Sequence, residues 1–270
     1  MTKLIFWSLI LSIGINIHGC YTQRPSTSKA IQNTILSLND FPLDDVKDSG
    51  KRLMNLPLGL HRIGSPPFAS SPSLELKSTS SPKKPYLILI HGYKSRGYEW
   101  IYALHTLSQI GSIFFYRWDW TQCPQPATDT LLKALTSFKQ PLTLFGHSYG
   151  GVITALASRQ YREKVSVNAH VIAAPLAGHS SLEKRCTFSI KDQLIRFSPS
   201  STTQLTQWRT LHHLDGAFKS LKTDPQIITL SGKGQIHRLP DTYKGHRLGH
   251  NWSISWVVDQ WVKMRTSIQK

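Results

Sequence analysis

Ser148, with a glycine two positions before it and another two positions after it, is the residue of this sequence whose surroundings best suit covalent chemistry. Ser148 lies in the pentapeptide Gly-His-Ser-Tyr-Gly, residues 146–150, which fits the pattern G-x-S-x-G. An apolar run, residues 142–145, precedes it, and a candidate helix, residues 152–161, follows it. A sharp turn from strand to helix exposes such a serine, and the residues two before and two after it must be small for the turn to close. The pattern therefore predicts that Ser148 is a nucleophile.

A second glycine-containing motif ends an apolar run upstream. Residues 86–90 read Tyr-Leu-Ile-Leu-Ile, which is typical of a parallel strand that is buried on both faces, and His91 and Gly92 follow directly. The start of a helix favours negative charge. The backbone N–H of Tyr149 is therefore predicted to stabilise the oxyanion that forms when Ser148 attacks a carbonyl carbon.

The order of these two motifs is specific. With His91-Gly92 ending one predicted strand and Gly-His-Ser-Tyr-Gly ending another, residues 85–270 resemble the α/β-hydrolase family, in particular its lipase and esterase branches. The resemblance implies an α/β fold, with a mostly parallel sheet, helices on both faces and a cap or lid insertion. It implies that the backbone N–H of Tyr93 is the second oxyanion donor, and it implies no cofactor.

The predicted base comes near the end of the chain. A serine nucleophile needs a base within hydrogen-bond reach and a third group that orients the base. The resemblance implies the chain order serine, acid, histidine, and it places the base just before the last helix. His250 stands there, with His246 as the alternative.

The spacing of His246 and His250, four residues apart, could also suit a metal ion. Glycines at 245 and 249 argue against a helix that would hold both rings, and the glutamate of the H-E-x-x-H motif is absent. The group His212, His213 and Asp215 is equally weak as a metal site. The sequence therefore favours no metal.

The acid is the least defined member of the triad. In the family, one strand lies beside the nucleophile strand, and the acid comes after the strand that follows that neighbour. Residues 227–230 are interpreted as this later strand. The residues after it, 231–235, contain no carboxylate. Asp241 is the next one, a short loop before His250, and it is the predicted acid. A Ser–His dyad without an acid stays possible, as does one of three further carboxylates, Asp192, Asp215 and Asp224.

The strands and helices that must position these residues are indicated by alternating patterns in the sequence. From residue 85 onward they predict a mostly parallel sheet. The predicted strands cover residues 86–90, 113–116, 142–145, 165–173 and 227–230, and the predicted helices cover residues 98–109, 126–138, 152–161 and 252–264. Residues 58–63 and 74–78 are expected to be antiparallel edge strands. Residues 176–225 lack the alternation and are expected to form the cap or lid. Within them, Thr202 to Leu214 is interpreted as an amphipathic helix, either a lid or a plain surface helix.

The first residues indicate export. Lys3 and an apolar stretch, residues 4–13, precede Ile-His-Gly-Cys, residues 17–20, which resembles a bacterial lipoprotein signal. An ordinary signal peptide or an uncleaved anchor would give a similar pattern. The predicted organisation is a signal peptide at 1–19, a tether lipidated on Cys20 with an N-terminal extension at 20–57, and a hydrolase domain at 58–270. Export makes a disulfide between Cys123 and Cys186 chemically possible, although the sequence does not give their distance.

The net charge of +17 and the pI of about 9.9 indicate an anionic partner. For an exported, membrane-anchored protein, this partner is an anionic membrane or envelope surface, on the periplasmic or outer-membrane face. No nucleic-acid motif is present, and export removes the chain from cytoplasmic nucleic acid.

Two classes of function follow. The first is a serine hydrolase that cleaves carboxylic esters, with lipid-like acyl groups, through an acyl-enzyme. Thioesterase, amidase and acyltransferase are its mechanistic relatives. The second is a non-catalytic envelope lipoprotein that uses the hydrolase fold as a binding scaffold, which the missing carboxylate after residues 227–230 favours.

Overall fold

A seven-stranded sheet forms the centre of the computed structural model, which describes residues 43–63, 84–184, 186 and 189–268. The edge strand β1 pairs antiparallel with β3, and every other neighbouring pair is parallel. The strands, in their order across the sheet, are β1 (Gly59–Ile63), β3 (Ser112–Arg117), β2 (Tyr86–Ile90), β4 (Leu142–His147), β5 (Val167–Ile172), β7 (Thr203–Arg209) and β9 (Gly234–Arg238).

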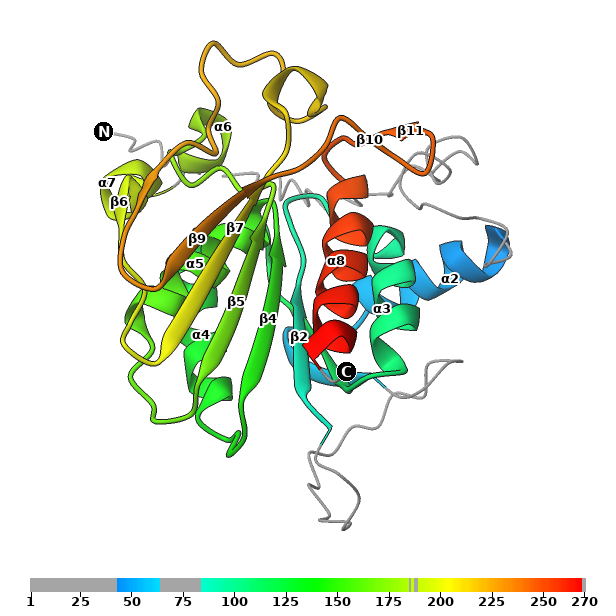
Figure 1. Ribbon diagram of the computed structural model, residues 1–270. Helices are drawn as coiled ribbons and strands as arrows, with labels where there is room; N and C mark the ends of the chain where they lie inside the picture. The colour runs from blue at the N-terminus through cyan, green and yellow to red at the C-terminus, as the bar shows by residue number, and fades with distance from the viewer. Residues whose placement is uncertain (1–42, 64–83, 185, 187–188, 269–270) are drawn as a thin grey trace, which may run out of the picture.

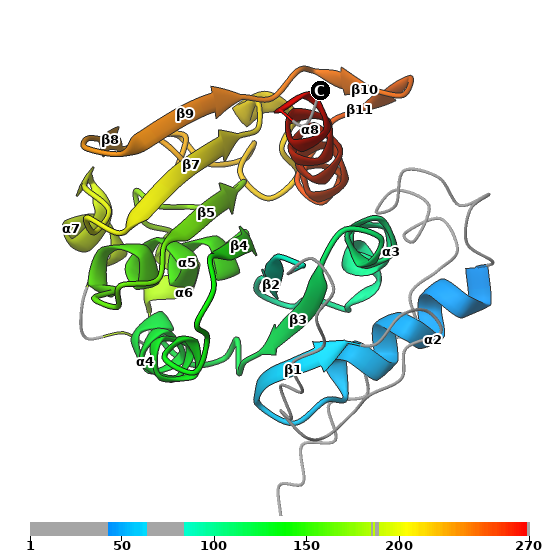
Figure 2. The same cartoon turned by 60° about the horizontal axis from the view of Figure 1, so that its bottom comes forward.

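Helices cover both faces of this sheet (Figures 1 and 2). On one face lie α4 (Pro124–Leu135) and α5 (Tyr149–Gln160), which share a buried apolar cluster with Ile88 and Ile90 of β2. The other face carries α2 (Leu43–Met54), α3 (Ile101–Ser108) and α8 (Trp252–Ile268), whose cluster includes Leu87 and Leu89. Because successive side chains of a strand point to opposite faces, a strand that is apolar throughout fills both clusters. The predicted α/β fold, a mostly parallel sheet with helices on both faces, is confirmed.

The largest difference from the sequence-based expectation is β7. Residues 202–214 were expected to form an amphipathic helix, but Thr203–Arg209 is a strand in the main sheet, between β5 and β9. Leu205 and Trp208 do not share one helical face, since Leu205 lies in the cluster under α5 and Trp208 in the cluster under α8. Their spacing of three residues puts them on opposite faces of a strand.

Residues 227–230 are correspondingly not a strand of the main sheet. Within them, β8 (Thr229–Leu230) pairs with β6 (Arg196–Phe197) in a separate two-stranded sheet, and the last strand of the main sheet is β9. The antiparallel edge strand expected at 58–63 is present as β1, whereas the one expected at 74–78 lies outside the described residues.

The expected cap region, residues 176–225, is interrupted by β7. Before β7 it holds α6 (Ser180–Glu183), α7 (Ile190–Leu194) and β6, and after β7 it holds a turn of 3-10 helix, η2 (His212–Leu214). A disulfide joins Cys186, which follows α6, to Cys123 at the start of α4, with the two Cα atoms 5.5 Å apart. The pairing that the sequence left open is therefore formed.

The N-terminal extension predicted for residues 20–57 includes α2, which packs on the domain. Leu53 and Met54 belong to the cluster of α3 and α8, and the backbone carbonyl of Met54 accepts a hydrogen bond from Arg117 Nε at 3.0 Å. The predicted signal peptide and Cys20 lie outside the described residues. Among the described helices, none is long and apolar enough to cross a lipid bilayer.

Candidate active site

Ser148 lies on a sharp turn between β4 and α5, as the G-x-S-x-G pattern predicts. Its backbone has φ 55° and ψ −123°, with a positive φ that side chains other than glycine rarely adopt. The flanking glycines make the turn sterically feasible. A Cβ atom at Gly146 would lie 2.0 Å from Thr154 Oγ1, and one at Gly150 would lie 2.3 Å from the carbonyl oxygen of Ile90. The turn therefore holds Ser148 at the carboxyl end of the sheet, half-buried, in a conformation that costs about 1–3 kcal/mol.

His250 lies just before α8 and contacts a buried carboxylate. Its Nδ1 is 3.0 Å from Asp215 Oδ2 and 3.0 Å from Oδ1. The side chain of His250 is 15% exposed, whereas that of Asp215 is fully buried. The ring of Phe218 packs edge-on against the imidazole, with the ring centroids 5.0 Å apart. An imidazole held through Nδ1 in this way keeps Nε2 free to exchange a proton.

Asp215 is held ionised by its surroundings. Burial by itself raises the pKa of this carboxyl group, but the charge of His250 and the hydrogen bonds outweigh burial and lower the pKa below its ordinary value. Besides His250, Thr210 donates its hydroxyl to Oδ2 at 2.5 Å, and the backbone N–H of Ala217 donates to Oδ1 at 2.8 Å. A carboxylate with these partners can orient an imidazole and stabilise its protonated form.

The acid that was predicted from the sequence is therefore not the residue beside His250. Asp241 is exposed, its backbone carbonyl accepts from Leu248 N at 2.8 Å, and its carboxylate accepts from the hydroxyl of Thr242 at 3.5 Å. It precedes the hairpin of β10 (Thr242–Tyr243) and β11 (His246–Arg247). Asp215 follows β7, which is the strand beyond β5, the neighbour of the strand that leads to Ser148. This is the place in the sheet where the family resemblance implies the acid. Asp241 does not occupy this position, because Thr203–Arg209, which the sequence predicts as part of a helix, is a strand that brings Asp215 to His250.

Asp224, Asp192 and His246, which the sequence also left as candidates for the triad, have different surroundings. Asp224 Oδ1 accepts from the backbone N–H of Gln226 at 3.0 Å, and Asp192 lies exposed in α7. His246 is exposed in β11 and its ring packs on Trp252, with the ring centroids 4.8 Å apart. Among the residues that the structure describes, no group of three or more His, Cys, Asp or Glu side chains is arranged to hold a metal ion.

The two predicted oxyanion donors, the backbone N–H groups of Tyr93 and Tyr149, belong to segments that lie next to Ser148. A Cβ atom at Gly92 would lie 2.9 Å from Ser148 Cβ, so the loop after β2 that carries Tyr93 passes directly beside Ser148. Tyr149 is the first residue of α5, and its N–H is one of those that a helix leaves without an intrahelical acceptor. Neighbouring His91 is a structural residue: its Nε2 accepts from Trp118 N at 3.2 Å, and burial lowers its pKa to about 3.

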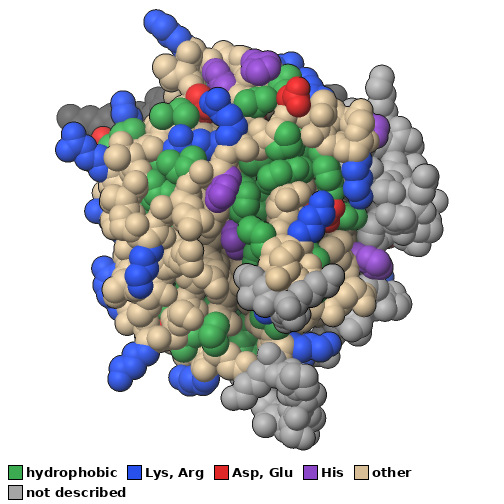
Figure 3. Space-filling model, in the orientation of Figure 1, with side chains coloured by type: hydrophobic (Ala, Val, Ile, Leu, Met, Phe, Trp, Pro, Cys, Tyr) green, Lys and Arg blue, Asp and Glu red, His purple; other side chains and the backbone are tan. Residues whose placement is uncertain are grey.

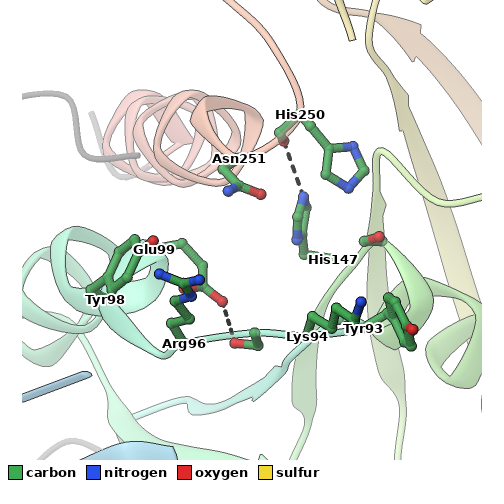
Figure 4. Close-up of a pocket in the computed structure, with 11 residues that line it drawn as sticks. Tyr93, Lys94, Arg96, Tyr98, Glu99, His147, His250 and Asn251 are labelled. Carbon is green, nitrogen blue, oxygen red and sulfur yellow. Dashed lines mark hydrogen bonds between the residues drawn. The ribbon is translucent and has the colours of Figure 1, made fainter. Parts of the chain in front are cut away.

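His147 holds the loop that carries His250, a role that the sequence did not predict. Its Nε2 donates to the backbone carbonyl of His250 at 3.0 Å, and the centroids of the two rings lie 4.6 Å apart (Figure 4). Burial, followed by the charge of His250, lowers the pKa of His147 to about 3. A neutral His147 is therefore a donor at Nε2. Its position beside Ser148 in the motif is the sequence signal that could have drawn attention to it.

Ser148 and His250 line one pocket of about 110 Å³ (Figure 4). Three segments form its wall: the loop after β2 with the first residues of the 3-10 helix η1 (Tyr98–Trp100), the turn at Ser148, and the residues before α8. The lining residues are Gly92, Tyr93, Lys94, Ser95, Arg96, Tyr98, Glu99, His147, Ser148, His250 and Asn251.

Comparison with known proteins agrees with the fold. A family model described as alpha/beta hydrolase matches residues 124–181, the segment from α4 through β4, the Ser148 turn, α5 and β5 to the start of α6. The comparison with curated proteins finds no match.

Solved structures that resemble the chain include Est1E from Butyrivibrio proteoclasticus, at 14% identity over 71% of this chain and 91% of that one, with a TM-score of 0.47. A putative hydrolase from Agrobacterium vitis S4 has 12% identity over 79% and 98%, with a TM-score of 0.47. The Paleococcus ferrophilus monoacylglycerol lipase has 12% identity over 77% and 99%, with the same TM-score. Similarity at this level does not extend to activity. The strand order and the family match at the Ser148 turn identify an α/β-hydrolase fold.

Proposed function

We propose that the protein is a serine hydrolase that cleaves carboxylic esters through an acyl-enzyme. The observation that carries the proposal is the pair of His250 and buried Asp215 in the pocket that also contains Ser148. A base with an orienting carboxylate beside an accessible serine is the arrangement that activates a hydroxyl group at neutral pH.

In the proposed reaction, His250 Nε2 takes the hydroxyl proton of Ser148 while the oxygen attacks the ester carbonyl. The backbone N–H groups of Tyr93 and Tyr149 stabilise the oxyanion. His250 then donates the proton to the leaving alcohol, which leaves the acyl group on Ser148. Water attacks the acyl-enzyme with His250 again as the base, and the acid product departs. Asp215 accepts a hydrogen bond from Nδ1–H of His250 throughout and stabilises the imidazolium.

The turnover of ethyl butyrate by purified protein tests this proposal. Replacing Ser148 with alanine should lower kcat by several powers of ten, because the proposed acyl-enzyme forms on the Ser148 hydroxyl. Circular dichroism checks that the variant is folded. Undiminished turnover by the folded Ser148→Ala protein would rule the mechanism out.

A non-catalytic role for the fold has lost its supporting observation. It was favoured by the absence of a carboxylate after residues 227–230, and Asp215 supplies a carboxylate at His250 from a different loop. Thioesterases, amidases and acyltransferases share the first steps of this mechanism. Matched ester, thioester and amide substrates distinguish an esterase from a thioesterase and an amidase. An acyltransferase would form a new ester when an alcohol is added.

We also propose that the protein is an exported lipoprotein that is anchored through Cys20. The disulfide between Cys123 and Cys186 supports export, because disulfides persist in oxidising compartments. Replacing Cys20 with serine should release the protein from membranes or block its maturation. A variant that still requires detergent for extraction would contradict anchoring through Cys20.

The anionic membrane or envelope surface remains the proposed partner, because a net charge of +17 attracts such surfaces. Basic side chains are spread over the visible face of the molecule rather than gathered in one patch (Figure 3).

A further inference from the structure

The pocket at Ser148 is small and polar. A volume of about 110 Å³ accommodates several water molecules or a short acyl chain, given that one water needs about 10–15 Å³ by the same measure. Most side chains in its wall are charged or hydrogen-bonding, including Lys94, Ser95, Arg96, Glu99, His147 and Asn251. A long alkyl chain would therefore bury little apolar surface in this pocket, and burial of apolar surface is what drives the binding of such chains.

Two cationic side chains line the pocket. Lys94 and Arg96 belong to the loop after β2, and both are exposed. Within the described part of the chain, neither lies within ion-pair distance of a carboxylate. Lys94 Nζ is 5.2 Å from the centre of the Tyr93 ring. Cationic groups without a carboxylate partner at a pocket wall favour a ligand that carries negative charge.

The carboxyl group in the same wall does not oppose this preference strongly. Glu99 is 6% exposed, and the hydroxyl of Ser95 donates a hydrogen bond to its Oε1. Burial raises the pKa of Glu99, which favours the neutral acid. Among the described residues, Glu99 is held by Ser95 and forms no ion pair with Lys94 or Arg96.

The N-terminal end of α8, which carries the positive end of the helix dipole, adds to the positive charge at the pocket. Asn251 lines the pocket and immediately precedes this 17-residue helix, and its carbonyl accepts from the backbone N–H of Ile254 at 3.3 Å. Figure 4 shows Asn251 at the start of α8, facing the segment that carries Arg96 and Glu99. Anions are favoured at such a helix end.

We propose that this pocket selects esters whose acyl part is short and ends in an anionic group, which lies against Lys94 and Arg96. The proposal rests on the proposed function, since the same Ser148 performs the hydrolysis. It replaces the lipid-like acyl group that the sequence suggested with a small acidic one.

Ethyl esters of matched length test the selectivity. The ratio of kcat/KM for monoethyl glutarate to kcat/KM for ethyl pentanoate, followed in a pH-stat, should exceed one, and ethyl octanoate should be the poorest of the three. Replacing Arg96 or Lys94 with glutamine should lower that ratio about fivefold, the scale of one exposed charge pair. The control is Lys139→Gln, which removes the same charge at an exposed position. Lys139 lies three residues before β4, at the edge of the sheet opposite to Ser148. This variant should leave the ratio unchanged.

The result that would overturn the selectivity is a preference for the neutral esters, or an equal ratio in wild type and in Arg96→Gln and Lys94→Gln. Reaction with a fluorophosphonate separates this failure from failure of the proposed function. A protein that reacts at Ser148 but prefers ethyl octanoate has the proposed chemistry without the proposed pocket. A protein that neither reacts with the probe nor hydrolyses any ester has neither.

Discussion

The contact between His250 and Asp215 joins residues 35 positions apart, and the proposed chemistry depends on it. Replacing Asp215 with asparagine keeps the shape but weakens the orientation of the imidazole and removes the charge that stabilises its protonated form. We expect kcat to fall about 10⁴-fold while KM changes little, because the substrate pocket is left intact.

The matched control is Asp241→Asn, which changes the same functional group at an exposed position. Steady-state kinetics with one ester should show near-normal kcat for this variant. Equal losses in both variants, or a loss in Asp241→Asn alone, would contradict the role assigned to Asp215.

At the residue scale, local motifs were predictable and distant partners were not. Ser148 is recognisable because the small residues that its turn requires, Gly146 and Gly150, stand two positions before and two positions after it. The partner of His250 depends on where a separate strand ends. That information is spread over the whole sheet and is not contained in the residues around Asp215.

At the scale of elements, the strands that are apolar throughout were predictable, whereas β7 was not. The residues of β2 form an uninterrupted apolar run. The sequence of β7, Thr-Gln-Leu-Thr-Gln-Trp-Arg, has polar residues on both faces, several of which are buried. Gln207 is fully buried and donates to the carbonyl oxygen of Gln226 at 2.6 Å. Tertiary hydrogen bonds of this kind make polar side chains tolerable inside a sheet, and no local periodicity reveals them.

The disulfide gives a prediction at the same scale. Cys123 and Cys186 are 63 residues apart, and closing a loop of that length stabilises a protein by about 4 kcal/mol through the entropy of the unfolded chain. The double variant Cys123→Ser, Cys186→Ser should therefore unfold at a lower temperature than the oxidised protein. Thermal unfolding with and without reductant checks this, and the double variant should be insensitive to the reductant. A double variant that melts at the same temperature as the oxidised wild-type protein would show that the bond contributes no stability.

At the scale of the whole molecule, buried histidines predict acid sensitivity. Burial is the largest factor that lowers the pKa of His91, His147 and His170 from 6.5 to about 3. Between these two values, the unfolded chain binds more protons than the folded one. Stability is therefore complete above about pH 6.5 and is lost as the pH falls toward 3, by up to about 1.4 kcal/mol per pH unit for each histidine.

Urea unfolding at pH 7, 6 and 5 measures this slope above the range in which carboxylates titrate. In His170→Gln, one such group is removed while glutamine can still accept the hydrogen bond that Trp208 donates to the ring. The slope of the free energy of unfolding against pH should then decrease by the amount that corresponds to about one bound proton, even if the variant is less stable at every pH. An unchanged slope would mean that His170 is protonated in the folded protein.

The central claim is that Ser148 is a nucleophile activated by His250 and Asp215. The most direct measurement is mass spectrometry of the intact and digested protein after reaction with a fluorophosphonate. We expect one adduct per chain, located on the peptide that contains Ser148, absent in Ser148→Ala and formed far more slowly in Asp215→Asn. An adduct on another residue, or no adduct on a folded wild-type protein, would contradict the claim.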